Sequence, residues 1–442
     1  MQQVLTAKLK LDLSQEQKAL LRQVCLAYRD SLNYTSQVAF ANGQLDSGYK
    51  LQKLVYTDLR QRYGLPSQMA CNVPRQVAST YKGLKTKAKQ NAAHRKEGKT
   101  QKRYRGLEKP PKFVSRTCTL NYGRDYSFVK PGVSIVTLQG RIKVPYHGYH
   151  KHVQLIRSGS AKIGAAKIYY ARSSQTYYLL VSLELEIPDI QPEDIKRVVG
   201  VDVGQRYLAV TTDTNNRTHF YNGKQSVHKA AAYQRARKSL QRKGTRSAKR
   251  RLVALSGRER RFIAERNHCI AQQIATPATL IGLEDLTHIR ERTQPRRKGK
   301  SASSRQRQAN HRQAKWSFAE LHQFVDYKAI LKGSLAIKVD ADYTSQSCVC
   351  CGHTSSNNRP NKGLIFRCEN CGKELHADLV GARNVALRTL LVRQDWASTG
   401  RLSAVPDGSS DETKAARLSR FAELRWTAEP SPACNLRFKR GC

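Results

Sequence analysis

The chain has 442 residues, of which 79 are lysine or arginine and 33 are aspartate or glutamate, so its formal net charge is +46. The charged fraction is an ordinary 25%, which makes the chain one-sided in charge rather than rich in it. Such an excess calls for a polyanionic partner, either a nucleic acid or an anionic membrane. No stretch approaches about 18 consecutive apolar residues, and the first residues hold no apolar secretory segment, so the sequence predicts neither a transmembrane helix nor a signal peptide.

The first half of the chain predicts a strand, a group of helices and a second group of strands. Residues 1–13 alternate between polar and apolar side chains, as a half-buried strand does. Residues 14–112 have helical patterns and end in a run, from 81 to 112, of 12 basic and two acidic residues. Residues 113–195 are rich in Val, Ile, Tyr and Thr with turn signals between them. We expect a small β-barrel that takes in the first strand, with the helices as an insertion.

The second half predicts a different alternation of strands and helices. Apolar strands are expected at 198–203 and 207–212, and a short buried strand is expected at 279–283. Between them, residues 231–270 hold 13 basic and two acidic residues in a helical pattern, with breaks near two glycines. Residues 290–315 hold ten basic residues and one acid, which favours a loop.

The last part of the chain predicts a helix, a strand, a cysteine cluster and a second helix. A capping box formed by Ser317 and Glu320 is expected to open the first helix. A strand at 334–339 leads into the cysteines, and residues 375–393 form the second helical pattern. Residues 394–442 are rich in Ser, Pro and Gly without periodicity, so we expect a disordered tail.

Four of the eleven cysteines have the spacing of a metal site. Two C-x-x-C pairs separated by sixteen residues are typical of tetrahedral Zn²⁺ sites, because each pair forms a tight knuckle that brings two thiolates to one ion. Gly352 and Gly372 follow the pairs and supply the permissive backbone, which favours Cys351 over Cys350 as a ligand. A closed site of four thiolates is structural rather than catalytic. The expected ligands are Cys348, Cys351, Cys368 and Cys371.

Three carboxylates lie at strand ends or at the start of a helix. Asp202 and Glu284 each close an apolar strand, and Asp378 begins the helix after the cysteines. Each one alone is more simply structural, since acids are favoured in the first turn of a helix and are common at strand ends. Asp285 remains an alternative to Glu284, because a fully buried strand shows no clear faces.

Together, the three acids fit a catalytic pattern. Strand–acid, strand–acid and helix–acid units can converge on one point, where three carboxylates would bind two Mg²⁺ ions about 4 Å apart. One ion would activate water and the other would stabilise the leaving 3′ oxygen of a phosphodiester. This chemistry suits a chain whose charge predicts a nucleic-acid partner.

Four strings of this sequence closely resemble the TnpB family of transposon-encoded, RNA-guided endonucleases, which are related to compact type V CRISPR effectors. They are Gly200–Gly204, Gly282–Leu286, Tyr343–Cys348 and His376–Asn384. Any one of them is weak, whereas their order and spacing over about 195–393 are specific. The N-terminal half resembles the family in plan alone.

The resemblance implies a multidomain α+β fold, in which a helical recognition lobe is inserted in a small β-barrel (wedge) domain and is followed by an RNase H-like RuvC domain with an inserted zinc ribbon. It implies Asp202, Glu284 and Asp378 as the catalytic acids and Mg²⁺ ligands, and so selects Glu284 over Asp285. The ribbon would bind one structural Zn²⁺ through its four cysteines and touch target nucleic acid. The implied domains are wedge strand 1–13, recognition lobe 14–112, remaining wedge 113–195, nuclease 196–343, zinc ribbon 344–374, nuclease 375–393 and disordered tail 394–442.

The function so implied is Mg²⁺-dependent cleavage of complementary DNA beside a short adjacent motif, directed by a transposon-derived guide RNA. The expected partners are the guide RNA and double-stranded target DNA, with no membrane, in a prokaryotic cytoplasm and on the nucleoid when DNA is bound. Intact Asp202, Glu284 and Asp378 favour this enzyme over an RNA-guided DNA-binding repressor without cleavage. A transposase-type RNase H-fold protein would share the acids but would need no RNA.

Overall fold

The computed structural model describes residues 1–98, 100–287, 289, 303–304, 306–307, 317–360, 363–402 and 414–426. The basic loop predicted at 290–315 therefore falls almost wholly outside the described residues. The chain divides into two compact units, Gln2–Glu186 and Met1 together with Ile187–Cys442. None of the helices in the described ranges has the length and apolarity that a membrane crossing requires.

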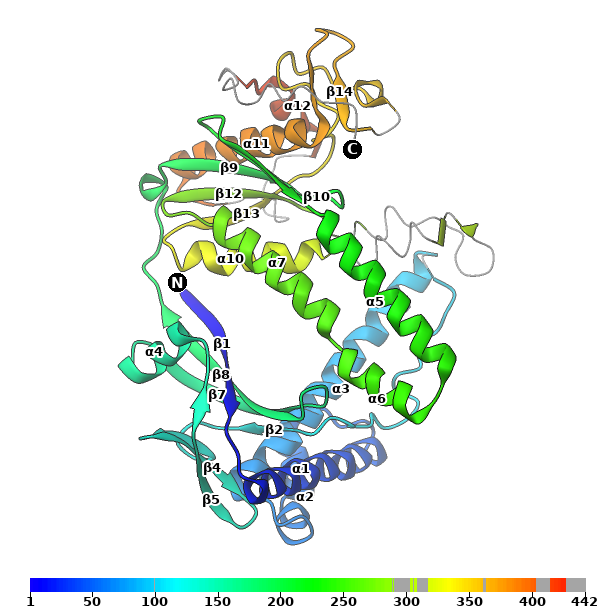
Figure 1. Ribbon diagram of the computed structural model, residues 1–442, viewed down its shortest axis with the longest axis vertical. Coiled ribbons are helices and arrows are strands. Elements are labelled where there is room, and N and C mark those ends of the chain that lie inside the picture. Colours follow the sequence, from blue (N-terminus) through cyan, green and yellow to red (C-terminus); the bar gives the residue numbers. More distant parts are fainter. Residues whose placement is uncertain are drawn as a thin grey trace. The chain divides into compact units, whose positions relative to one another are not determined.

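The unit Gln2–Glu186 combines two antiparallel sheets with four helices (Figure 1). Its larger sheet has the order β2-β7-β8-β1-β6, so the first strand of the chain lies between two strands that are far from it in sequence. Alternate residues of β1, from Leu5 to Leu11, are buried, as the alternation predicts. The strands are β1 Gln2–Leu11, β2 Thr117–Leu120, β3 Tyr126–Val129, β4 Gly132–Thr137, β5 Gly140–Val144, β6 Tyr146–His147, β7 Lys162–Ala171 and β8 Thr176–Glu186; the helices are α1 Gln15–Ala41, α2 Gly48–Gln61, α3 Ser67–Lys96 and α4 His150–Ser158.

The second unit is built on a mixed sheet with the order β11-β10-β9-β12-β13. Strands β9, β12 and β13 are parallel to one another, whereas β10 is antiparallel to both of its neighbours, β9 and β11. Strands β9 and β12 are almost entirely buried, because helices cover both of their faces. The strands are β9 Arg197–Asp202, β10 Tyr207–Asp213, β11 Thr218–Asn222, β12 Thr279–Glu284 and β13 Leu335–Val339.

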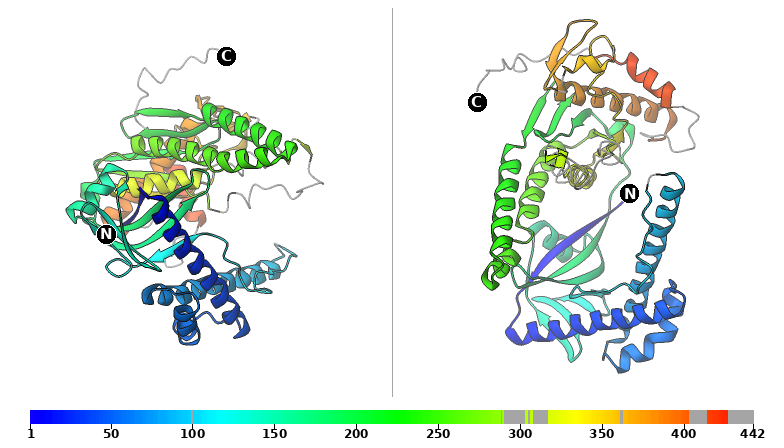
Figure 2. Two further views of the ribbon diagram at one scale, coloured as in Figure 1. Left: turned by 60° about the horizontal axis from the view of Figure 1, so that its bottom comes forward. Right: turned by 90° about the vertical axis from the view of Figure 1, so that its right-hand side faces the viewer.

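Helices on the two faces of this sheet make two separate cores (Figures 1 and 2). Val199 and Val201 of β9 pack toward α7 and α10, while Val198 packs toward α11. Successive residues of β9 therefore face opposite sides of the sheet, and the side that faces α11 is the one that carries the acids. The helices are α5 Lys224–Lys243, α6 Arg246–Leu255, α7 Arg258–Ile274, α10 Phe318–Ile330, α11 Ala377–Thr399 and α12 Lys414–Glu423, and a hairpin of β14 Ile365–Arg367 and β15 Glu374–His376 lies beside the cysteines.

Two sequence predictions are wrong in this unit. Ser317 does precede α10, but its side chain makes no capping hydrogen bond. The side-chain amide of Asn267 on α7 donates instead to Ser317 Oγ at 3.1 Å and to Glu320 Oε2 at 2.9 Å, so a tertiary contact replaces the local box.

The prediction of a disordered tail from residue 394 is also wrong for the residues that are described there. Helix α11 continues to Thr399, and α12 is held beside it by a guanidinium–carboxylate pair between Arg420 and Asp395 at 2.8 Å. These residues are ordered by partners that lie elsewhere in the chain, which the composition of the segment does not report.

Candidate active site and metal centre

The pairing of β9 with β12 brings two of the predicted acids together. The strands are parallel, with Gly282 beside Gly200 and Leu283 beside Val201, so the next residues in register are Glu284 and Asp202. Neighbouring strands are about 4.8 Å apart, and both side chains point to the same face of the sheet. The two carboxyl groups lie within hydrogen-bonding reach of each other.

Glycines on the same two strands let helix α11 approach closely. A Cβ atom on Gly200 would overlap the backbone of Ala382 and Ala386, and one on Gly282 would overlap the side chain of Thr389. Each glycine lies two residues before an acid and therefore faces the same side as that acid. The helix consequently lies directly on the face from which both carboxylates project.

The start of α11 supplies the third acid. His376 is the N-cap, and its Nδ1 accepts a hydrogen bond from the backbone N–H of Asp378 at 3.2 Å. One turn later, a Cβ on Gly381 would lie 3.1 Å from Cγ of Asp202. Asp378 thus begins the helix that packs on Asp202, and its charge acts on both Asp202 and Glu284.

The electrostatics of this site are those of crowded buried acids. Burial raises the pKa of Asp202 well above its usual value, and the neighbouring charges of Glu284 and Asp378 raise it further. Burial also raises the pKa of Glu284, although its hydrogen bond from Thr344 opposes that rise. Without a cation, Asp202 and Glu284 therefore hold protons more strongly than exposed carboxyl groups do, because burial favours the neutral form of each.

Polar residues that the sequence pattern did not single out surround the acids. Thr344 Oγ1 donates to Glu284 Oε1 at 2.7 Å, and Arg359 Nη2 donates to Asp378 Oδ1 at 3.5 Å. Thr344 stands in the string that precedes the cysteines, which was a usable signal, whereas nothing in the sequence marked Arg359. Asp285 faces elsewhere, and its carboxylate accepts from the backbone N–H of Thr287 at 3.0 Å.

The donor set fits Mg²⁺ chemically. Three carboxylates offer the hard oxygen ligands that Mg²⁺ prefers; Glu284 is buried, and Asp202 and Asp378 are half-buried. We regard Asp202, Glu284 and Asp378 as the residues that could hold such an ion.

The four predicted cysteines form a second candidate metal site. Their sulfur atoms all lie within 4.8 Å of one another, and Cys350 does not belong to this group. Gly352 and Gly372 have φ angles of 78° and 66°, the left-handed conformation that each knuckle needs. A tetrahedral set of four sulfur donors suits Zn²⁺. The group comprises Cys348, Cys351, Cys368 and Cys371.

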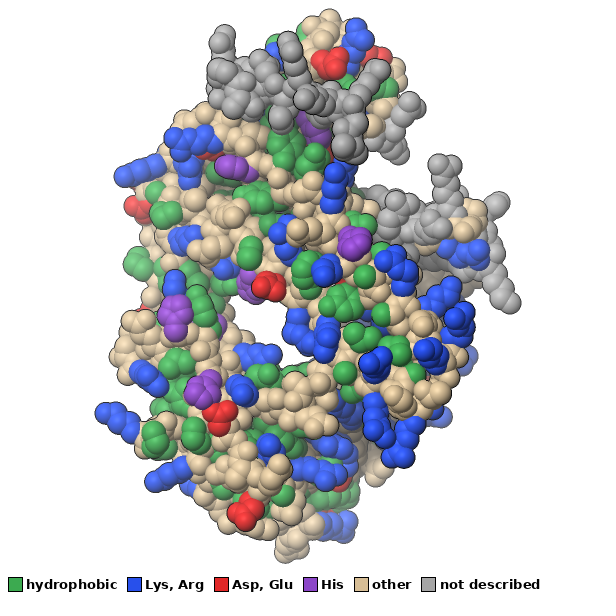
Figure 3. Space-filling view, in the orientation of Figure 1, with side chains coloured by type: hydrophobic (Ala, Val, Ile, Leu, Met, Phe, Trp, Pro, Cys, Tyr) green, Lys and Arg blue, Asp and Glu red, His purple; other side chains and the backbone are tan. Residues whose placement is uncertain are grey.

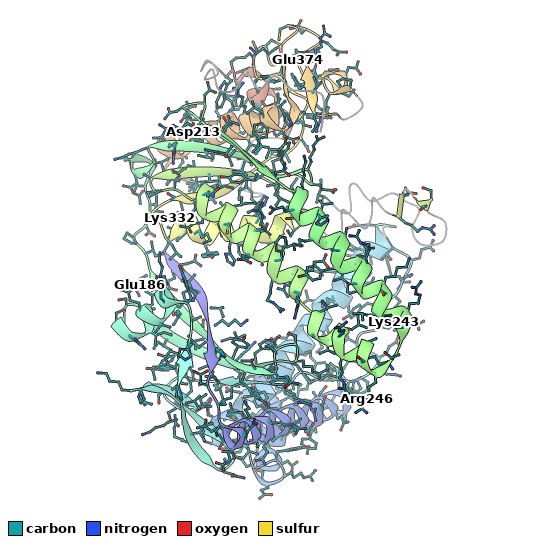
Figure 4. The ribbon with its side chains drawn as sticks, viewed as in Figure 1. Glu186, Asp213, Lys243, Arg246, Lys332 and Glu374 are labelled. Atoms are coloured by element: carbon teal, nitrogen blue, oxygen red, sulfur yellow. The ribbon has the colours of Figure 1, made fainter. Side chains whose placement is uncertain are left out.

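Three consecutive helices carry the basic run predicted at 231–270. Helices α5, α6 and α7 are separated at Gly244 and Gly257, both with positive φ, as the sequence predicts. Lys243 and Arg246 flank the first of these turns (Figure 4). Lysine and arginine side chains gather over α5 and α6 (Figure 3). The surface suits a polyanion such as a nucleic-acid backbone.

Comparison with known proteins gives matches to two family models. One, described as "probable transposase", matches residues 181–294, and the other, described as "Cas12f1-like, TNB domain", matches residues 318–385. These ranges contain all of the candidate site residues.

Individual proteins agree with the family models. The CRISPR-associated endodeoxyribonuclease Cas12f1 of Sulfoacidibacillus thermotolerans is 28% identical over 251 residues, which cover 52% of this chain and 55% of that protein. The TnpB-like protein of Methanocaldococcus jannaschii is 23% identical over 207 residues, covering 44% and 70%. A Cas12f1–sgRNA–target DNA complex has a similar fold, with a TM-score of 0.53 and 16% identity over 84% of this chain and 83% of that one.

The chain spans about half the length of the Cas12f1 relative that it matches. The matched segments extend from the end of β8 to the middle of α11, and they include both acid-bearing strands and the four cysteines. In this part of its sequence, the chain is similar to TnpB-like and Cas12f1 proteins.

Proposed function

We propose that the chain is an RNA-guided DNA endonuclease that binds a guide RNA and cleaves complementary double-stranded DNA beside a short adjacent motif. The observation that supports this proposal is the pairing of the Asp202 and Glu284 strands beneath helix α11, whose first turn carries Asp378. The relatives support it, because one is named as an endodeoxyribonuclease and the similar fold was found in a complex of guide RNA and target DNA.

The chemistry proposed is hydrolysis of a phosphodiester bond. Mg²⁺ bound by the three carboxylates would lower the pKa of the attacking water and stabilise charge on the leaving oxygen. The chain's own contribution is to hold the carboxylates in place. Thr344 fixes one oxygen of Glu284, and Arg359 lies beside Asp378, where its positive charge can attract a scissile phosphate.

The remaining parts take roles around this reaction. Residues 14–112 would form a recognition lobe inserted in a wedge domain, and residues 196–393 an RNase H-like nuclease with an inserted ribbon. One Zn²⁺ bound by the four cysteines would stabilise the ribbon, since ligation of a structural zinc contributes directly to folding. The basic helices α5–α7 would grip the backbone of a guide–target duplex, while base pairing reads its sequence. We propose a prokaryotic, cytoplasmic location, which the prokaryotic sources of the relatives support.

A cleavage assay tests the proposal. The chain is co-expressed with its flanking transcript, the bound RNA is sequenced, and matching DNA is offered with Mg²⁺. Wild type should cut and Asp202→Ala should not, whereas Asp285→Ala should cut because that carboxylate faces away from the cluster.

The other outcomes separate the alternatives. Binding of matched DNA without cutting by wild type would indicate an RNA-guided repressor. The absence of any discrete co-purifying RNA, together with joining of DNA ends, would indicate a transposase. Either result would overturn the proposal.

A further inference from the structure

The C-terminal residues that the sequence predicted to be disordered make an ordered contact with the cysteine cluster. We call residues 420–426 the C-terminal clasp. The backbone N–H of Trp426 donates to the carbonyl of Val349, which lies inside the first cysteine knuckle, at 2.8 Å. The Trp426 ring packs against the buried apolar cluster that includes Cys348, Cys368 and Val380. The clasp therefore covers the ribbon on the side of α11.

Trp426 also connects the ribbon to the sheet. Its indole Nε1 donates to Asn216 Oδ1 at 2.7 Å, in the turn between β10 and β11. Arg383 of α11 donates to the same oxygen at 3.3 Å, and its guanidinium carbon lies 5.3 Å from the Trp426 ring centroid. One side chain thus contacts the cysteine knuckle, the acid-bearing helix and the sheet.

Phe421, also in the clasp, makes a similar contact with a second buried arginine of α11. The Arg388 guanidinium lies 4.5 Å from the Phe421 ring centroid, and it donates to the backbone carbonyls of Asp340 and Asp342. Arg383 and Arg388 are 2% and 3% exposed, so these cations depend on the aromatic rings and carbonyls for the solvation that water would otherwise give.

The segment gripped in this way leads to the acids. Arg388 holds the carbonyls at 340 and 342, and Asn384 Nδ2 donates to the carbonyls of Thr344 and Ser347 at 2.7 and 2.8 Å. Thr344 in turn donates to Glu284. Residues 340–349, which include the Glu284 hydrogen-bond donor Thr344 and the first cysteine, are therefore clamped between α11 and the clasp.

The burial of α11 agrees with a second cover. Every residue from 379 to 389 is buried, although the sheet by itself can cover only one side of a helix. Gly352 shows how closely the clasp approaches the ribbon, since a Cβ there would overlap the backbone of Ala422.

We propose that the C-terminal clasp holds the four-cysteine ribbon on helix α11, with Trp426 and Phe421 as positioning residues for the segment that carries Thr344. The positioning of an active site rests on the proposed function, whereas the attachment of the ribbon does not. The clasp acts through Arg383 and Arg388 and touches no reacting atom.

The test uses the full chain and measures backbone hydrogen exchange over residues 340–353, together with transfer of Zn²⁺ to a chromogenic chelator. Trp426→Ala should accelerate both, with zinc transfer faster by about tenfold, the lower end of the effect of losing a partner of a metal ligand. Trp426→Phe keeps a ring over Arg383 and should recover most of the protection. Glu423→Ala, an exposed change at the last residue of α12 and within the clasp, should match wild type.

Equal exchange and zinc transfer in wild type and Trp426→Ala would overturn the proposal. So would a Trp426→Phe variant as unprotected as Trp426→Ala, because the ring would then not be the cause. If Trp426→Ala does not fold, Phe421→Ala replaces it, because this change leaves the Val349 contact in place. Phe421→Ala should accelerate hydrogen exchange at residues 340–344. Exchange at the wild-type rate there would overturn the proposal as well.

The link to the acids has its own readout. At saturating guide and DNA, Phe421→Ala should lower the cleavage rate about tenfold while leaving DNA affinity unchanged, because a positioning residue acts on the reaction step. An unchanged rate would refute the positioning role alone. If no variant cuts, including wild type, the proposed function fails, and hydrogen exchange still tests the clasp.

Discussion

Gly200 and Gly282 are register partners on parallel strands, and each lies two residues before an acid of the candidate active site. Because the side-chain direction repeats every two residues, a glycine and the following acid share one face of the sheet. The missing side chains admit α11, and α11 carries the third acid. The motif Gly-x-acid therefore encodes a packing relationship as well as a carboxylate.

Gly200→Ala tests this relationship. The added methyl would overlap the backbone of Ala382 and Ala386, which cannot rotate away, so α11 must shift. We expect a loss of about 1–3 kcal/mol in the free energy of unfolding from overpacking, together with a large loss of cleavage. Chemical unfolding and the cleavage assay measure the two effects.

Gly83→Ala is the matched control for that change. Gly83 lies within α3 and has nothing within 4 Å of the position of an added Cβ. Alanine there should be neutral or stabilising by up to about 1 kcal/mol, because it restricts the unfolded chain and favours helix. If Gly200→Ala were as mild as this control, the close approach of α11 would not matter.

Asp202→Asn should abolish cleavage and yet stabilise the metal-free protein. The folded-state pKa of Asp202 is raised, so its contribution to stability is present below its unfolded pKa and is lost as pH rises through the folded value. At pH 8 in EDTA the uncharged amide should therefore add about 1–2 kcal/mol to the free energy of unfolding. The gain should shrink in acid, which urea unfolding at two pH values would show.

Asp213→Asn should change the free energy of unfolding in the opposite direction to Asp202→Asn, by lowering it. Asp213 is also buried, but its carboxylate accepts the backbone N–H groups of Asn215 and Arg217 and pairs with Arg197 at 3.6 Å. Removing its charge should destabilise the protein by about 1–3 kcal/mol. Destabilisation by Asp202→Asn of similar size would mean that its carboxylate is structural.

The sequence marked the acids because each is attached to a local pattern, and their catalytic role stays a prediction. Asp202 and Glu284 follow apolar strands, and the cysteine pairs carry their own glycines. It predicted Ser317 and the tail poorly because their partners are distant: Asn267 lies on another helix, and Trp426 is ordered by the ribbon and α11. Periodicity reports the face that a regular element buries, and it contains no information on single long-range hydrogen bonds.

Binding to nucleic acid should weaken steeply with salt, since phosphate contacts release counterions. Lys249 and Arg250 are exposed on α6, and changing both to alanine should reduce the slope of log affinity against log salt by about 2 if each contacts a phosphate. Lys332→Ala should leave the slope unchanged, because its ammonium donates to the carbonyls of Gln272 and Ala275 at the end of α7. Equal slopes for all three proteins would argue against α6 as a contact surface.

His322 should make the protein sensitive to mild acid. Burial on α10, helped by the charge of Lys338, lowers its pKa to about 4, so it is neutral in the folded state. A group whose pKa is lower in the folded state than in the unfolded state loses its contribution to folding stability as the pH falls below the unfolded pKa, which is about 6.5 for histidine. Wild type should lose about 2 kcal/mol more than His322→Leu between pH 7 and pH 5. The buried acids titrate in both proteins, so the difference isolates His322, and parallel pH profiles would contradict its depressed pKa.

Cys350 and Cys368 provide the sharpest pair for the metal centre. Both lie in the ribbon, but the sulfur of Cys368 lies 3.5 Å from that of Cys351, whereas Cys350 is exposed and outside the cluster. Cys368→Ser should lose Zn²⁺ and loosen the ribbon, because one of four thiolates is gone. Cys350→Ser should retain one Zn²⁺ per chain, which elemental analysis of the purified protein would measure. Full zinc content in Cys368→Ser would show that Cys368 is not a ligand, and loss of zinc in Cys350→Ser would show that Cys350 is one, because a structural zinc site needs all four of its ligands.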